Sequence, residues 1–98
     1  MFRILLTPQA HQDLLEIWIY VAQDSLKAAD QFLSIIDGKL NMLARAPRIG
    51  RKREELALGL RSFPAGSYIV FYRLGRGTLE IIRILHGSRD VLAIFEEE

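Results

Sequence analysis

Four arginines in the second half of the chain are the residues best suited to recognition or chemistry. Arg61, Arg73 and Arg83 each interrupt an apolar run, and Arg89 follows the last of these runs. A guanidinium pairs in a bidentate manner with carboxylate or phosphate, so arginines that converge on one concave face would bind such a group. The alternative is that each arginine forms a structural ion pair with a nearby acid. Taken together, the four favour convergence on one binding face.

One histidine and two tyrosines are further candidates. His86 stands beside Ser88, Arg89 and Asp90. Its imidazole could act as a general acid or base, although a structural hydrogen bond is the commoner role, and the three polar neighbours are too close in sequence to form a Ser–His–Asp triad. Tyr68 and Tyr72 lie in a β-rich run, where they could stack on a ligand or belong to the core.

Metal and cofactor chemistry have little support in the sequence. The chain has no cysteine and two histidines, which excludes a thiol nucleophile and a thiolate zinc site. Gly75-Arg76-Gly77 precedes a predicted strand instead of a helix, so we interpret it as a hairpin turn and not as a phosphate-binding loop. We therefore expect no metal and no cofactor.

Length, composition and charge predict one globular domain over residues 1–98. Half of the residues are apolar and a quarter are charged, and no apolar run approaches the roughly 20 residues of a membrane-spanning helix. The net charge of +1 hides an uneven distribution, because residues 45–61 carry +4 and residues 90–98 carry −4. A basic second half suggests an anionic partner or an acidic protein segment, and we expect a cytoplasmic location without membrane binding.

The first half of the chain must supply a strand and two helices. Residues 2–6 read as a short strand, after which Thr7 offers an N-cap and Pro8 fills the first helical position. Asp24 or Ser25 could cap a second helix, which continues past Gly38 because its apolar period continues. The short break between the helices predicts an antiparallel hairpin. The predicted apolar stripes comprise His11, Leu14, Leu15, Trp18, Val21 and Ala22 in the first helix, and Ala29, Phe32, Leu33, Ile36, Leu40 and Leu43 in the second.

The second half changes from helical to strand periodicity. After a charged loop over residues 48–55, the sequence predicts strands at residues 60–63, 68–74 and 78–86, with turns at residues 64–67 and 75–77. Residues 91–95 could form a short closing helix or strand. The fold class is therefore α+β: one short N-terminal strand, an α-helical hairpin and an antiparallel three-stranded meander in a single domain.

Several ordered segments give the whole chain a family resemblance. Taken in order, they are similar to the RelE/ParE superfamily of bacterial toxins, and specifically to its ParE branch. The matching segments are residues 5–10 (LLTPQA), the helix pair with Ile17 and Trp18, residues 46–51 (APRIGR), 59–63 (GLRSF), 69–73 (IVFYR) and 82–90 (IRILHGSRD).

The resemblance implies a toxin of a type II toxin–antitoxin system and leaves two activities. RelE-like members cut mRNA on the ribosome with basic side chains and commonly a C-terminal tyrosine, whereas ParE-like members are associated with poisoning DNA gyrase. In this chain Arg61 and Arg89 match arginines of the nuclease pattern, but Ala57 and Gly59 replace its lysines and Phe95 stands in place of the tyrosine. These departures favour a non-enzymatic gyrase inhibitor over a ribosome-dependent endoribonuclease.

The resemblance also implies a partner. We expect a cognate ParD-like antitoxin in a hetero-oligomer, with an acidic segment lying between the helical hairpin and the sheet, DNA gyrase as the target, and no sequence-specific nucleic-acid binding by the toxin alone. The residues expected to bind antitoxin or target are Arg61, Tyr68, Tyr72, Arg73, Arg83, His86 and Arg89.

Overall fold

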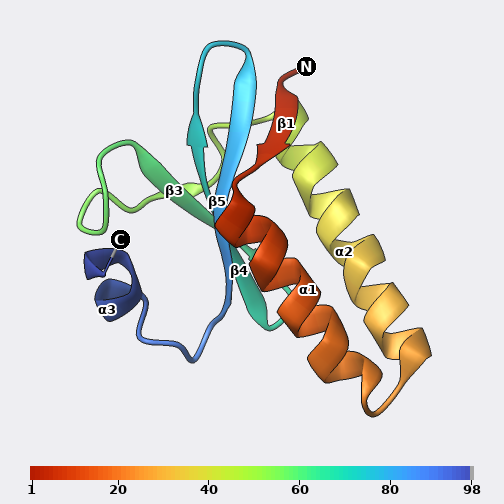
Figure 1. Ribbon diagram of the computed structural model, residues 1–98. Coiled ribbons are helices and arrows are strands. Elements are labelled where there is room, and N and C mark those ends of the chain that lie inside the picture. Colours follow the sequence, from red (N-terminus) through yellow and green to blue (C-terminus); the bar gives the residue numbers. More distant parts are fainter. Residues whose placement is uncertain (98) are drawn as a thin grey trace.

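The computed structural model describes residues 1–97 and confirms the α+β class (Figure 1). Both predicted helices and all four predicted strands are present, and the ambiguous C-terminal segment is a helix. A two-residue strand in the charged loop was not predicted. In chain order the elements are β1 (Arg3–Leu6), α1 (Pro8–Ala22), α2 (Leu26–Arg45), β2 (Arg51–Lys52), β3 (Leu60–Ala65), β4 (Tyr68–Leu74), β5 (Thr78–His86) and α3 (Val91–Glu96).

The five strands form one sheet in the order β1-β5-β4-β3-β2. Strands β2 to β5 pair antiparallel, as the meander predicts, and β1 pairs parallel to β5. Strand β5 lies between β1 and β4 and is therefore a central strand of the sheet. The turn between β3 and β4 is shorter than predicted, because Ala65 still pairs with Tyr68 and Gly66 alone adopts the positive φ that reverses the chain.

Local capping chemistry fixes where the helices begin. The Thr7 hydroxyl accepts a hydrogen bond from the Ala10 N–H at 3.0 Å, and the Ser25 hydroxyl accepts one from the Ala28 N–H at 3.0 Å. Each hydroxyl satisfies an amide that has no partner within its helix. Ser25 is therefore the cap of α2, which settles the choice between Asp24 and Ser25.

The two faces of the sheet bury separate apolar clusters. The helical hairpin covers the larger cluster, while α3 and the loop before β3 cover the smaller one (Figure 1). The larger cluster comprises Ala10, Phe32, Ile36, Leu40, Leu43, Ala44, Ala65, Val70, Tyr72, Leu79, Ile81 and Ile84. The smaller cluster is formed by Leu60, Phe71 and Leu85, with Phe95 of α3 packed against it.

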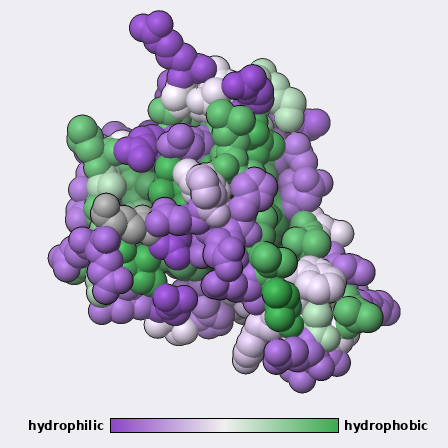
Figure 2. Space-filling model, in the orientation of Figure 1, coloured by the Kyte–Doolittle hydropathy of each residue, from purple (hydrophilic) through white to green (hydrophobic). Residues whose placement is uncertain are grey.

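The buried face of α1 differs from the predicted apolar stripe. Ala10 and Asp13 are buried, whereas His11 is exposed and Leu15 is 53% exposed. In α2 the stripe is confirmed except for Leu33, which is 40% exposed. Hydrophobic side chains are visible among hydrophilic ones over the helical hairpin in Figure 2. The reason for the error in α1 is that a buried carboxylate, which an apolar pattern cannot reveal, faces the sheet.

An extra residue in β5 alters which side chains share a face. Phe71 pairs with Arg83 and Tyr72 pairs with Ile81, so Ile82 is inserted between two ladder partners. This bulge shifts the alternation by one residue. Strict alternation would place Leu79, Ile81, Arg83 and Leu85 on one face, but Leu79 and Ile81 join the larger cluster and Leu85 joins the smaller one.

Asp13 fastens α1 to β5. Its carboxylate accepts hydrogen bonds from Arg83 Nε at 2.8 Å and Arg83 Nη2 at 2.9 Å, and from the Ile84 backbone N–H at 2.9 Å. The Asp13 and Arg83 side chains are only 8% and 15% exposed. The pair is geometrically well formed, because the guanidinium fork matches both carboxylate oxygens. Removal of one member leaves the other charge buried and uncompensated.

Replacement of Asp13 by alanine should therefore destabilise the fold strongly. We expect Asp13→Ala to lower the free energy of unfolding by about 3–5 kcal/mol, measured by urea denaturation. The matched control is Glu16→Ala, which removes an exposed carboxylate one turn later in α1 and should change stability by less than about 0.5 kcal/mol. Equal effects of the two substitutions would contradict this role for Asp13.

Candidate functional site

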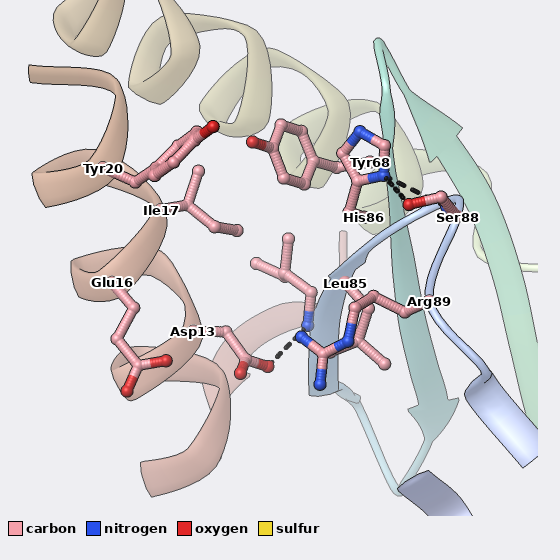
Figure 3. A pocket seen from close by; sticks show the side chains of 10 residues that line it. Asp13, Glu16, Ile17, Tyr20, Tyr68, Leu85, His86, Ser88 and Arg89 are labelled. Carbon is pink, nitrogen blue, oxygen red and sulfur yellow. Dashed lines mark hydrogen bonds between the residues drawn. The ribbon is translucent and has the colours of Figure 1, made fainter. Parts of the chain in front are cut away.

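A cleft of about 500 Å³ opens between α1 and the C-terminal half of β5 (Figure 3). One wall is a face of α1, and the other comprises the end of β5 and the loop that follows it. The cleft combines an apolar interior with charged and polar groups at its margins. Its lining residues are Asp13, Glu16, Ile17, Tyr20, Tyr68, Ile84, Leu85, His86, Ser88 and Arg89.

Two tyrosines face one another across this cleft. In Figure 3 the hydroxyl groups of Tyr20 on α1 and Tyr68 on β4 point toward each other. Tyr68 is fixed by edge-to-face ring contacts with Phe32 at 5.1 Å and His86 at 5.3 Å between centroids. Partial burial, and secondly the neighbouring Tyr20, raise the pKa of Tyr68, so its phenol remains neutral. Tyr20 is 71% exposed and offers aromatic surface to a partner.

His86 is held by the loop that follows β5. Its Nδ1 accepts a hydrogen bond from the Ser88 N–H at 3.1 Å and lies 2.7 Å from the Ser88 hydroxyl. An accepting Nδ1 places the proton of the neutral ring on Nε2 and makes the hydroxyl the donor. Asp90 lies apart from this pair and caps α3 through the Ala93 N–H at 3.2 Å. The three residues therefore do not form a Ser–His–Asp triad, as their spacing predicts.

The arginines do not converge on one face, contrary to expectation. Arg83 pairs with Asp13, and Arg61 donates from one nitrogen to the carbonyl oxygens of Arg48 at 3.1 Å and Gly50 at 2.9 Å. The strand register explains this separation. Arg61 pairs with Tyr72, whose side chain lies on the face of the larger cluster, whereas Arg73 pairs with Leu60, whose side chain lies on the face of the smaller cluster. Arg61, Arg73 and Arg83 lie on three strands and Arg89 lies in the loop after β5. Strand alternation and the β5 bulge direct the three strand arginines differently.

Of the four candidate arginines, Arg89 lines this cleft, and among the described residues its guanidinium is not engaged in an internal ion pair. It is exposed, and within residues 1–97 its side chain has no hydrogen bond or ion pair. Glu16 lies in the α1 wall of the same cleft. A partner that enters the cleft meets this cation without first breaking an internal ion pair.

Arg61 and Arg73, although they belong to opposite faces of the sheet, both line a second cleft near the β2 edge, of about 540 Å³. Lys52 of β2 pairs directly with Arg61 in the sheet and lines the same cleft, as do Glu54 and Leu58. Arg73 Nε lies 3.9 Å from Glu80 Oε1, and both side chains are nearly half exposed, so their attraction is weak. Sequence reasoning missed Lys52, because the two-residue strand that positions it has too little pattern to detect.

Tyr72 belongs to the core and not to an exposed binding face. Its ring is fully buried, and its hydroxyl donates to the Pro47 carbonyl at 2.7 Å and accepts from the Gly50 N–H at 2.9 Å. A Cβ at position 50 would collide with this hydroxyl, which explains the glycine. Together with Arg61, Tyr72 fixes the loop that connects α2 to β2. Its inclusion among the partner-binding residues is corrected on this ground.

The described part of the chain contains neither a candidate metal site nor a helix that could span a membrane. Across residues 1–97, histidine and acidic side chains do not form a group of three or more that could hold a metal ion. The helices within the same range are too short or too polar to cross a membrane.

Loss of the Tyr72 hydroxyl should destabilise the fold in a pH-dependent manner. We expect Tyr72→Phe to lower the free energy of unfolding at pH 7 by about 1–3 kcal/mol, because a buried carbonyl and N–H lose their partner. Burial is the main cause that raises the pKa of Tyr72 above its ordinary value of 10.0. The unfolded chain therefore loses this proton first, and wild-type stability falls as the pH rises above about 10.

Urea unfolding of wild type and Tyr72→Phe at pH 7 and pH 10.5 tests this prediction. The stability difference between the two proteins should shrink at the higher pH. Tyr20→Phe is the control, because that phenol is exposed. A difference for Tyr72→Phe that stays constant across this range would contradict the proposed burial of its neutral form.

Comparisons with known proteins agree with this architecture. Residues 4–91 match the family model described as the ParE toxin of the type II toxin-antitoxin system parDE. Toxin ParE1 of Mycobacterium tuberculosis (strain ATCC 25618 / H37Rv) is 38% identical over 91 residues, which are 91% of this chain and 93% of the relative. Toxin ParE1 of Caulobacter vibrioides is 36% identical over 89 residues, covering 90% and 92% respectively.

A solved structure gives the same picture of the fold. The structure described as the chromosomal ParDE TA system from P. aeruginosa superposes with a TM-score of 0.73 at 21% identity. The superposition covers 88% of this chain and 96% of the matched chain. At this low identity the similarity is one of overall fold.

Proposed function

The chain belongs to the ParE toxin family of type II toxin–antitoxin systems, and on this premise we propose that it inhibits DNA gyrase by binding and not by catalysis. We further propose that a cognate ParD-like antitoxin neutralises it by occupying the cleft between α1 and β5. The single observation that carries the second statement is the cleft itself, which joins exposed aromatic surface to an uncommitted cation.

The commitments of the candidate catalytic groups support binding over RNA cleavage. Cleavage needs a base for the 2′-hydroxyl, an acid for the leaving group and a cation for the phosphorane. Phe95, which replaces the nuclease tyrosine, has no hydroxyl and packs edge-to-face on Phe71 at 5.1 Å within the smaller cluster. Arg83 is engaged with Asp13, and Arg61 supports the α2–β2 loop.

The chemistry of the cleft supports an antitoxin segment that is both apolar and acidic. Apolar burial against Ile17, Tyr20 and Tyr68 would supply most of the affinity, at roughly 25 cal/mol per Å² of apolar surface removed from water. Exposed ion pairs contribute about 0–1 kcal/mol each, so a carboxylate on Arg89 would mainly set register and association rate. Of the arginines expected to bind antitoxin or target, Arg89 is the one that lines this cleft.

Parallel target assays test the proposed activity. Purified toxin should inhibit supercoiling by DNA gyrase and leave labelled mRNA intact in a ribosomal translation reaction. His86→Ala is the informative variant, because His86 is the titratable imidazole nearest to Arg89 along the chain. Normal gyrase activity together with mRNA cleavage that His86→Ala abolishes would overturn the proposal in favour of the endoribonuclease.

Charge removal in the cleft tests the antitoxin surface. Arg89→Gln should slow association with the cognate antitoxin by about threefold to tenfold at low salt and flatten its salt dependence, as measured by surface plasmon resonance. The matched control is Arg76→Gln, which removes an exposed arginine from the β4–β5 turn, outside the cleft. Similar slowing by both variants would show that general charge, and not the cleft, guides association.

A further inference from the structure

Strand β5 extends beyond the neighbour on its outer edge. The β1 ladder ends where Leu6 pairs with Ile81, while β5 continues to His86. On the other side β4 accompanies β5 as far as the pairing of Tyr68 with His86. The last five residues of β5 thus have a strand on one side only, and their outer edge faces α1 and the cleft (Figure 3).

The bulge determines which backbone groups point to this open edge. Before the bulge, the carbonyl groups of Gly77 and Ile81 accept hydrogen bonds from β1 and from Thr7, so odd-numbered residues face outward. After it, the Ile82 carbonyl accepts from the Thr7 hydroxyl at 2.8 Å and the Ile84 N–H donates to Asp13. Even-numbered residues therefore face outward from Ile82 onward.

Two side chains stand in for a strand along the first part of this edge. Thr7 satisfies the Ile82 carbonyl, and Asp13 satisfies the Ile84 N–H. The N–H and C=O of one strand residue point to the same side, so the Ile84 carbonyl is also directed outward. Two residues later the His86 N–H points outward as well, whereas the Gly87 N–H bonds inward to Ser67 at 2.9 Å.

We propose that the antitoxin segment binds here as an added β-strand, pairing its backbone with the Ile84 carbonyl and the His86 N–H. This inference rests on the proposed function and specifies how the same cleft is occupied. Alternate side chains of an added strand point to opposite faces. One set would pack between Ile17 and Tyr68, and an acidic residue further along would reach Arg89.

The Arg89 guanidinium favours a segment that places a carboxylate at its end of the cleft, on the wall opposite Glu16 of α1. An extended acidic segment meets the same cation favourably. Asp13 limits the length of the pairing, because its carboxylate already occupies the Ile84 N–H.

A backbone-methylation scan distinguishes an added strand from a bound helix. Synthetic peptides that span the C-terminal segment of the cognate antitoxin would each carry one N-methylated amide, and their affinity for the toxin would be measured by fluorescence anisotropy competition. Within the segment that binds the cleft, we expect a loss of at least about tenfold at the one position whose N–H donates to the Ile84 carbonyl, and little change at the positions on either side of it. Losses over several consecutive positions, or at none, would overturn strand pairing.

Amide hydrogen exchange by NMR on the full toxin–antitoxin complex gives an independent measurement. The His86 amide should exchange at least about tenfold more slowly in the complex than in free toxin. The Gly87 amide is the internal control, because it is bonded to Ser67 in the free toxin.

The outcomes separate this inference from the function on which it rests. A stable complex with unchanged His86 exchange would overturn the added strand and leave antitoxin binding at the cleft intact. Failure of the antitoxin to bind would overturn both. A toxin that dimerises on its own and protects His86 would identify a second copy as the occupant and overturn the proposal.

Discussion

The contact of Asp13 with Arg83 and Ile84 is the constraint on which the site depends. It satisfies a buried carboxylate, a mostly buried guanidinium and an outward-facing strand N–H at once. Because it joins α1 to β5, it fixes both walls of the cleft relative to each other. The same carboxylate covers the open strand edge at Ile84, so the boundary between the internal fold and the surface available to a partner lies at this residue.

A second set of polar contacts organises the opposite end of the sheet. Tyr72 and Arg61 fix the loop between α2 and β2 through its backbone carbonyl and N–H groups. Both side chains could have recognised a ligand by their chemistry. They are instead used to satisfy backbone groups that would otherwise lack partners beside the core, where an unmade hydrogen bond is costly.

The distribution of polar groups supports the proposal that this chain acts by binding. Of the three candidate arginines on strands, Arg83 is committed to Asp13 and Arg61 to the α2–β2 loop. The cleft retains Arg89, an imidazole held by Ser88, and aromatic surface from Tyr20 and Tyr68. Such a surface combines the apolar area that gives affinity with a charge that gives orientation.

The sequence by itself determined the order of the two long helices and the four longer strands, and it determined the family. Caps at Thr7 and Ser25, apolar periods of the helices, and the β-rich runs are local signals, and local hydrogen bonding and burial are sufficient to specify such elements. The ordered motifs identified the ParE branch, because they depend on residue identity and not on spatial contact. The role of His86 beside Ser88 was also accessible, since both lie within one short turn.

Only the tertiary structure decided which polar residues are free. Asp13 and Arg83 are 70 residues apart, and nothing near either residue in sequence signals their pairing. The extra residue Ile82 changes the face of the sheet to which the following side chains of β5 point, and an alternating sequence pattern does not reveal this change. The prediction that the arginines converge was wrong for the same reason. Whether a charged side chain is paired depends on the long-range register of the strands, which is set by how all elements pack together.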